Sequence, residues 1–142
     1  MGATGTPHRK TLAGPADLFA LHRHAPAAYP FLLQSLAGHP QSGRYDILFA
    51  APGETLVAAD SPDFFEALTA AAAREPAEPA EPAGELPFCG GWFLLLGYEA
   101  AGRIEPRLRL PPSPHALPDA LAVRCRGAIV RDHVREIGRA HV

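Results

Sequence analysis

The strongest core candidate in this chain is Leu86-Pro-Phe-Cys-Gly-Gly-Trp-Phe-Leu-Leu-Leu-Gly-Tyr98. Gly90 and Gly91 open its apolar part and Gly97 closes it, which predicts a long buried strand in the middle of a sheet. A glycine pair at this place fits a bulge or sharp strand entry, or else a site where a ligand approaches the backbone. We favour the strand entry.

The segments before this strand predict a helix, a strand, a hairpin and a second helix. In order, they are a helix over 16–24, a strand over 29–35, a turn over 38–43, strands over 44–51 and 54–59, and a helix over 61–74. Pro52-Gly53 is typical of a turn, so we expect the two middle strands to form a hairpin. Ser61 followed by Pro62 is typical of a helix N-terminus, with Ser61 as the N-cap.

The segments after the core candidate predict more strand. We expect a short helical turn over 99–103, a proline-rich loop over 107–118, and a strand pair over 120–134 that breaks at Gly127. Strands, a helix and then strands again indicate an α+β fold, with a mostly antiparallel sheet and flanking helices.

The composition fits one modest domain. The chain has 142 residues, 47% apolar and 20% charged, with 15 acidic and 13 basic side chains. That balance lacks the basic excess of non-specific nucleic-acid binding, and no apolar run reaches the roughly 18 residues of a membrane span. We therefore expect no nucleic-acid or membrane partner and a cytoplasmic location. Lys10 is the only lysine among the 13 basic residues, which indicates a GC-rich, bacterial genome.

The ends and one internal segment differ in composition from the rest. Residues 1–15 lack periodicity and predict a flexible N-terminus, whereas residues 16–135 form the domain. The Pro-Ala-Glu repeat within 75–85 predicts an exposed loop, because proline at every third residue prevents regular hydrogen bonding. Residues 136–142, Glu-Ile-Gly-Arg-Ala-His-Val, resemble the translation of a common sequencing adapter, so we expect a non-native tail after Arg135.

Catalytic motifs are absent from the sequence. It contains no phosphate-binding loop, dinucleotide-binding glycine pattern, nucleophile elbow or zinc-ligand spacing. His22 and His24 point in different directions on a helix, so we expect surface residues, and we expect Cys89 to be a small buried apolar residue. Ser35 at the end of a buried strand, with Arg44 after the next turn, could face a pocket for an amino acid.

Three motifs resemble one enzyme family, component I of aminodeoxychorismate synthase and anthranilate synthase. The first runs through Pro87-Phe-Cys-Gly-Gly-Trp92 and Gly97-Tyr-Glu99 to Arg103-Ile-Glu105, and is similar to the family's Pro-Phe-x-Gly-Gly and Gly-Tyr-(Asp/Glu) segment. The second is Phe31-Leu-Leu-Gln-Ser35 followed by Arg44-Tyr-Asp-Ile47, and the third is Leu117-Pro-Asp-Ala120 followed by Ala128-Ile-Val-Arg-Asp-His133. They occur in the family's order over about residues 16–134. Arg-Tyr-Asp-Ile in place of Arg-Tyr-Ser favours the aminodeoxychorismate branch.

The resemblance implies the N-terminal part of the chorismate-utilising enzyme fold. In that family, an antiparallel N-terminal domain packs on a C-terminal chorismate-binding domain that holds the catalytic residues and Mg²⁺. This chain would then be a non-catalytic fragment, inactive alone and without a cofactor of its own, because the catalytic domain is absent from it. The full-length parent would make 4-amino-4-deoxychorismate from chorismate and glutamine-derived ammonia, beside a glutamine amidotransferase subunit, in folate (4-aminobenzoate) biosynthesis. The alternatives are anthranilate synthase component I of tryptophan biosynthesis and a stand-alone, non-enzymatic ligand-binding module.

The resemblance also implies a tryptophan pocket, which is regulatory in anthranilate synthase and structural in aminodeoxychorismate synthase. The site residues carried over by motif are Ser35, which would contact the ligand, and Ser42, Gly43, Arg44 and Tyr45, which would line the pocket. Gln34 stands where the anthranilate enzymes usually carry glutamate, which weakens the expectation of feedback inhibition by tryptophan.

Overall fold

The structure is a computed structural model that describes residues 9–14, 16–36, 43–74 and 86–135, and the backbone of residues 137–141. In chain order its elements are β1 (Arg9–Thr11), α1 (Leu18–His24), β2 (Phe31–Leu33), β3 (Tyr45–Val57), α2 (Phe64–Ala73), β4 (Gly91–Leu96), the 3-10 turn η1 (Tyr98–Ala100), α3 (Ala101–Ile104), β5 (Ala120–Asp132) and β6 (Ile137–His141). The predicted loops over 38–43 and 75–85 lie outside the described residues, apart from Gly43.

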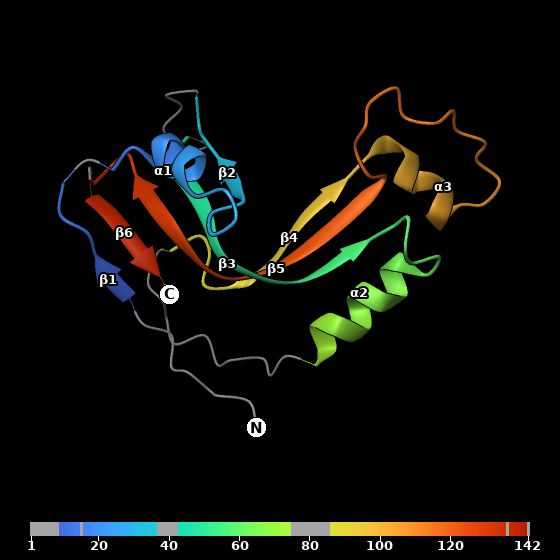
Figure 1. Cartoon of the computed structure of the whole chain (residues 1–142), viewed down its shortest axis with the longest axis horizontal. Coiled ribbons are helices and arrows are strands. Elements are labelled where there is room, and N and C mark those ends of the chain that lie inside the picture. Colours follow the sequence, from blue (N-terminus) through green and yellow to red (C-terminus); the bar gives the residue numbers. More distant parts are fainter. Residues whose placement is uncertain (1–8, 15, 37–42, 75–85, 136, 142) are drawn as a thin grey trace. The chain divides into compact units, whose positions relative to one another are not determined.

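The described strands form one sheet (Figure 1). Its order is β1-β6-β5-β3-β2, and β4 also pairs with β5. The pairs β1–β6, β2–β3 and β5–β6 are antiparallel. The predicted α+β class, with a mostly antiparallel sheet and flanking helices, is therefore confirmed.

Two compact units divide the chain. Unit 1 takes in Met1–Gly53, Glu81–Gly91 and Cys125–Val142, and unit 2 takes in Glu54–Ala80 and Trp92–Arg124. Strands β3 and β5 contribute residues to both units, because the division falls within each of them.

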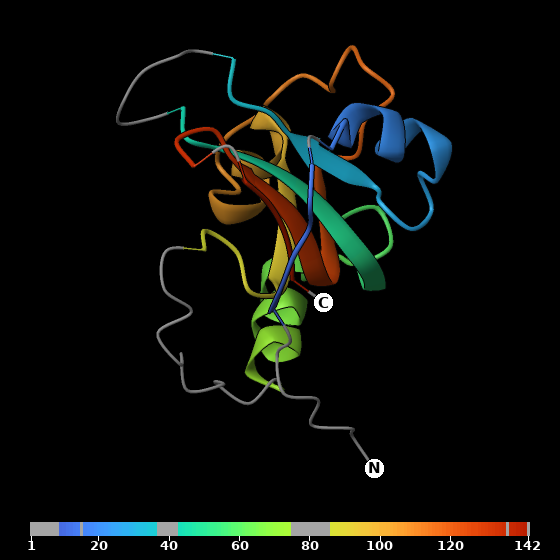
Figure 2. The same cartoon turned by 90° about the vertical axis from the view of Figure 1, so that its left-hand side faces the viewer.

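In unit 1, α1 lies against β2, as Figures 1 and 2 both show. Asp17 is the N-cap of α1, and its side chain accepts a hydrogen bond from the Ala20 backbone N–H at 2.9 Å. The helix ends at His24, just before Pro26, so the predicted helix is confirmed with a slightly later start. The buried apolar side chains of this unit are Leu18, Leu48, Phe49, Cys125, Ala128 and Val130.

In unit 2, the core is built mainly from alanines around one large ring. The buried cluster is Ala58, Phe64, Ala100, Ala120 and Ala122, with Leu56, Phe65, Leu68 and Trp92 packed against it. Phe64 is 1% exposed and meets the ring of Phe65 edge to face, with centroids 5.4 Å apart. Small alanine side chains allow the backbones to approach this ring closely, so the aromatic residues supply most of the buried apolar area.

The predicted hairpin at Pro52-Gly53 is wrong, because β3 runs through both residues as a single strand. Its pairing with β5 explains this: the His133 N–H donates to the Arg44 carbonyl near one end, and the Ala58 N–H donates to the Ala120 carbonyl near the other. Between these bonds β3 advances 14 residues (58 − 44) and β5 only 13 (133 − 120). The extra residue falls in the interval that contains Ala51, whose φ is 53°, so β3 absorbs the irregularity as a bulge and not as a turn.

The predicted break at Gly127 is also wrong, since β5 is one strand from Ala120 to Asp132. Three strands pair with β5, and it is buried over most of its length, Gly127 included. The strand continues through the glycine because the segments on either side of it belong to one paired and largely buried strand.

Strand β4 does not occupy the predicted central position. Among the described strands it pairs with β5 alone, and Leu94 and Leu96 are 45% and 51% exposed. An edge strand with one exposed face explains why only part of its apolar run is buried. The favoured strand entry is confirmed at its start, where Gly90 and Gly91 have φ values of 107° and 151°.

The start of α2 also differs from the prediction, and the described parts of the two chain ends form paired strands. Helix α2 begins at Phe64, with Asp63 in place of Ser61 at the N-cap, because Ser61 lies in a turn closed by its N–H on the Ala58 carbonyl. Arg9–Thr11, in the segment predicted to be flexible, forms β1. Ile137–His141, in the segment interpreted as a tail, forms β6, and the two strands pair with each other. The predicted helical turn over 99–103 and the loop over 107–118 are confirmed.

Candidate functional site

Residues of the second and third sequence motifs meet where β2 and β5 end and β3 begins. Ser35 follows β2, Arg44 precedes β3 and His133 follows β5. The His133 N–H donates to the Arg44 carbonyl at 2.8 Å, and the Ser35 hydroxyl donates to the Tyr45 carbonyl at 2.9 Å. We call the side chains gathered here the strand-end network: Ser35, Arg44, Tyr45, Asp46, Asp132 and His133.

Asp46 is the centre of the strand-end network. It is 3% exposed, and its Oδ1 accepts from the Ser35 backbone N–H at 2.9 Å. The same oxygen lies 2.9 Å from His133 Nε2. A buried carboxylate needs such partners, because burial removes the water that would otherwise solvate it. Asp46 therefore ties the end of β2 to the end of β5.

Arg44 and Asp132 form the second half of the network. Arg44 Nε donates to Asp132 Oδ1 at 3.0 Å and Nη2 donates to Oδ2 at 2.8 Å, which is a two-pronged ion pair. The guanidinium also lies over the ring of Tyr45, 4.8 Å from its centroid. The Arg44 hydrogen bonds, helped by the Val134 N–H, hold the pKa of Asp132 below its ordinary value of 3.8, against burial, which would raise it.

The structure brings together three of the five predicted site residues. Ser35, Arg44 and Tyr45 lie in the network, Gly43 directly precedes it, and Ser42 lies outside the described residues. Asp46, Asp132 and His133 lie in the Arg-Tyr-Asp and Asp-His motifs but were not predicted as site residues. Their membership in those two motifs was the pattern that could have identified them.

The network is arranged for binding or support and not for nucleophilic attack. The Ser35 hydroxyl donates to a backbone carbonyl, whereas the imidazole of His133 faces Asp46. No serine–histidine pair of the kind that activates a nucleophile is formed within the network.

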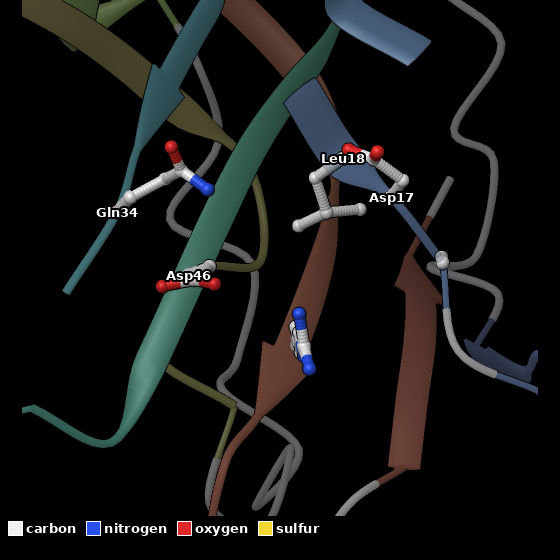
Figure 3. A pocket seen from close by; sticks show the side chains of 6 residues that line it. Asp17, Leu18, Gln34 and Asp46 are labelled. Carbon is white, nitrogen blue, oxygen red and sulfur yellow. The ribbon is translucent and has the colours of Figure 1, made fainter. Parts of the chain in front are cut away.

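An open pocket of about 390 Å³ lies in unit 1 beside Asp46 (Figure 3). Its lining residues are Ala16, Asp17, Leu18, Gln34, Asp46 and Arg131. In Figure 3, Asp17 and Leu18 approach from one side of the pocket, while Gln34 and Asp46 approach from the other.

This pocket is separate from the site that the resemblance implies. Gln34 lines the pocket, whereas the neighbouring Ser35, whose hydroxyl donates to the Tyr45 carbonyl, is not among its lining residues.

The remaining sequence candidates are not parts of a site. His22 Nδ1 lies 2.6 Å from the Tyr29 carbonyl, in a local contact that closes the loop after α1. Cys89 is exposed and Cys125 is buried, so the expectation that Cys89 is buried is wrong. Cys89 comes directly before the Gly90–Gly91 strand entry, outside the regular part of β4.

Searches for a metal site and a membrane span gave no candidate within the described part of the chain. Among the described residues, no group of three or more histidine, cysteine, aspartate or glutamate side chains could hold a metal ion. In the same residues, no helix has the length and apolarity needed to cross a bilayer.

Comparison with known proteins leaves the family open. No protein-family model matches the chain, and no curated protein matches it.

Proposed function

We propose that this chain is the N-terminal, non-catalytic domain of an aminodeoxychorismate synthase component I. In the whole protein it would support a chorismate-binding domain that makes 4-amino-4-deoxychorismate with ammonia from a glutamine amidotransferase subunit. The chain's own residues would position strands and hold a ligand, and the catalytic residues and Mg²⁺ would belong to the chorismate-binding domain.

The observation that carries the proposal is the strand-end network. The second and third motifs, which carry the resemblance, contain Ser35, Arg44, Asp46, Asp132 and His133, and these residues come from three separate segments. Hydrogen bonds and ion pairs of 2.8–3.0 Å connect them into one cluster. The residues of the two motifs supply each other's hydrogen-bond partners, which is expected if both motifs belong to one structural site.

Asp46 supports the aminodeoxychorismate branch over the anthranilate branch. An Arg-Tyr-Ser sequence would place a serine hydroxyl where Asp46 stands. A serine side chain is shorter and uncharged, so it would not offer one carboxylate oxygen to both the Ser35 N–H and His133. The third motif's histidine therefore has a partner that depends on the aspartate.

Tryptophan is the ligand that the proposal assigns to the side of β2 and β3 that carries Ser35. The Ser35 hydroxyl already donates to the Tyr45 carbonyl, so a ligand would either accept that hydroxyl proton instead or donate to its lone pairs. Replacing Ser35 with alanine removes both possibilities and leaves the backbone bond from Ser35 to Asp46 intact. We expect S35A to weaken tryptophan binding at least tenfold in calorimetry on the protein that also carries the chorismate-binding domain.

The decisive experiment is to read the gene downstream of the Arg135 codon and to assay the protein it encodes. We expect a chorismate-binding domain, and 4-amino-4-deoxychorismate as the product when the amidotransferase subunit and Mg²⁺ are supplied. Anthranilate as the product would move the chain to the tryptophan branch. An open reading frame without a chorismate-binding domain, or turnover of chorismate by residues 1–142 alone, would overturn the proposal.

A further inference from the structure

We propose that the pocket beside α1 binds a small polar zwitterion. Its ammonium group would lie between Asp17 and Asp46, and its carboxylate would pair with Arg131. This inference goes beyond the proposed function, because the pocket is lined by none of Ser35, Gly43, Arg44 and Tyr45, although it shares Asp46 with the strand-end network.

Two carboxylates, Asp17 and Asp46, would bind the ammonium group, because each has one oxygen without a described hydrogen-bond partner. Asp46 Oδ1 takes both described contacts, from Ser35 and His133, and among the described residues Oδ2 takes none. Asp17 Oδ1 caps α1 at Ala20, and its Oδ2 has no described partner either. Asp46 is 3% exposed, so the pocket opens onto a carboxylate that is otherwise buried. An ammonium group donates three hydrogen bonds and matches such a pair of acceptors.

The anionic end is set by Arg131. The bond between the His133 N–H and the Arg44 carbonyl fixes the register of β5 on β3, which places Arg131 across from Asp46. Cross-strand neighbours of opposite charge usually pair. In the described part of the chain Arg131 makes no ion pair or side-chain hydrogen bond, since Asp46 Oδ1 is taken by His133. Arg131 is exposed, so its fork of donors is open to a ligand, and a carboxylate fits it in two-pronged geometry.

The polarity of the walls selects a short ligand over an aromatic one. Four of the six lining residues are polar or charged, and the apolar ones, Ala16 and Leu18, offer little surface because Leu18 is itself 3% exposed. The net charge of Asp17, Asp46 and Arg131 is −1, so a lone anion would be repelled, and a lone cation would lie near the like charge of Arg131 with nothing to offset it. A zwitterion satisfies both ends, and the amide of Gln34 can donate or accept beside either.

The test is titration calorimetry of the whole chain with 4-aminobutyrate and β-alanine, with propylamine and propionate as single-charge controls. Both zwitterions are expected to bind, at least tenfold more tightly than either control. D17N keeps the N-cap, because asparagine caps helices as well as aspartate, and removes only the charge. D17N and R131Q should each weaken zwitterion binding at least tenfold, while R126Q, an exposed arginine on the same strand outside the pocket, should leave it unchanged.

Three results would overturn the inference: no binding of either zwitterion, equal binding of propylamine, or equal losses in R126Q and R131Q. Circular dichroism melts of D17N and R131Q should match that of the unmodified chain, so that a loss of binding is not a loss of fold. Tryptophan serves as the independent probe. Zwitterion binding that persists when tryptophan does not bind rejects the tryptophan pocket alone, and the reverse result rejects the zwitterion site alone.

Discussion

The Arg44–Asp132 ion pair gives a strong prediction, because its two members differ in burial and the pair is two-pronged. The Asp132 side chain is 9% exposed and the Arg44 side chain is 30% exposed. Replacing Arg44 with methionine leaves a carboxylate almost without solvent and without its cation. Replacing Asp132 with asparagine leaves a more exposed guanidinium beside a neutral acceptor that still accepts the Val134 N–H.

The expected magnitudes follow from those exposures. Removing one partner of a fully buried pair costs about 3–5 kcal/mol, and this pair should lie at the low end because Arg44 reaches water. We expect R44M to lower the free energy of unfolding by about 3 kcal/mol and D132N by about 1.5 kcal/mol, the scale of one charge-assisted hydrogen bond. The double variant should cost less than the sum by about 1.5 kcal/mol, since Asp132 no longer needs Arg44 once it is neutral.

The assay is urea unfolding at pH 7 and at lower pH, with the exposed Arg74–Glu54 pair as the matched control. Those side chains are 66% and 46% exposed, so R74M/E54Q should show a coupling of about 0–1 kcal/mol. Because the pKa of Asp132 is lowered in the fold, its contribution is present above 3.8 and is lost as the pH falls through the folded-state pKa. D132N should therefore flatten the loss of stability below pH 4. A coupling energy for Arg44 and Asp132 no larger than that of the control pair would refute the reasoning.

Three further predictions concern packing and backbone. Leu48 is 0% exposed, so L48A should cost about 2–5 kcal/mol in urea unfolding, whereas L96A, at a residue 51% exposed, should change stability by about 0.5 kcal/mol or less. Ala51 has a φ of 53°, so A51G should raise the free energy of unfolding by up to about 1 kcal/mol. A50G, in the same strand, should lower it. Trp92 Nε1 is buried without a partner among the described residues, a state that costs roughly 1–3 kcal/mol. Because W92F removes this unsatisfied donor, the relief should offset part of the lost packing, and a loss of stability above about 3 kcal/mol would contradict this.

The sequence predicted the elements whose patterns are local. Helix α1 carries its own N-cap at Asp17 and its own stop at Pro26, and the Gly90–Gly91 pair marks a backbone entry that needs positive φ. These features depend on a few consecutive residues, so they can be recognised without knowing the partners of a segment.

The errors arise where long-range pairing overrides local preference. Pro52-Gly53 favours a turn in isolation, but β3 pairs with β2 over Ile47–Phe49 and also pairs with β5, and it continues through these two residues. Gly127 would weaken an isolated strand, but β5 has three neighbours. In both places the hydrogen bonds to adjacent strands outweigh the roughly 1 kcal/mol by which a single residue can favour or disfavour extended backbone.

In the candidate site, too, local patterns could be predicted and long-range partners could not. The sequence identified Ser35 and Arg44 as a polar group at a strand end and an arginine after a turn, but spacing carries no information about which carboxylate each would meet. Their partners Asp46 and Asp132 lie 11 and 88 positions away, and only the pairing of β2, β3 and β5 brings them together. Residues that complete a site from distant strands cannot be found by periodicity, because periodicity describes one segment at a time.

Asp46 belongs both to the strand-end network and to the pocket beside α1, so the two should be thermodynamically linked. An ammonium group bound at the pocket side of this carboxylate would draw charge density from the oxygen that faces His133 and Ser35. By reciprocity, any change that weakens the His133 contact should tighten zwitterion binding by the same factor that zwitterion binding weakens the contact. H133L, which removes the contact to Asp46 Oδ1, should therefore bind 4-aminobutyrate more tightly than the unmodified chain. Unchanged affinity would mean that the two oxygens of Asp46 act independently.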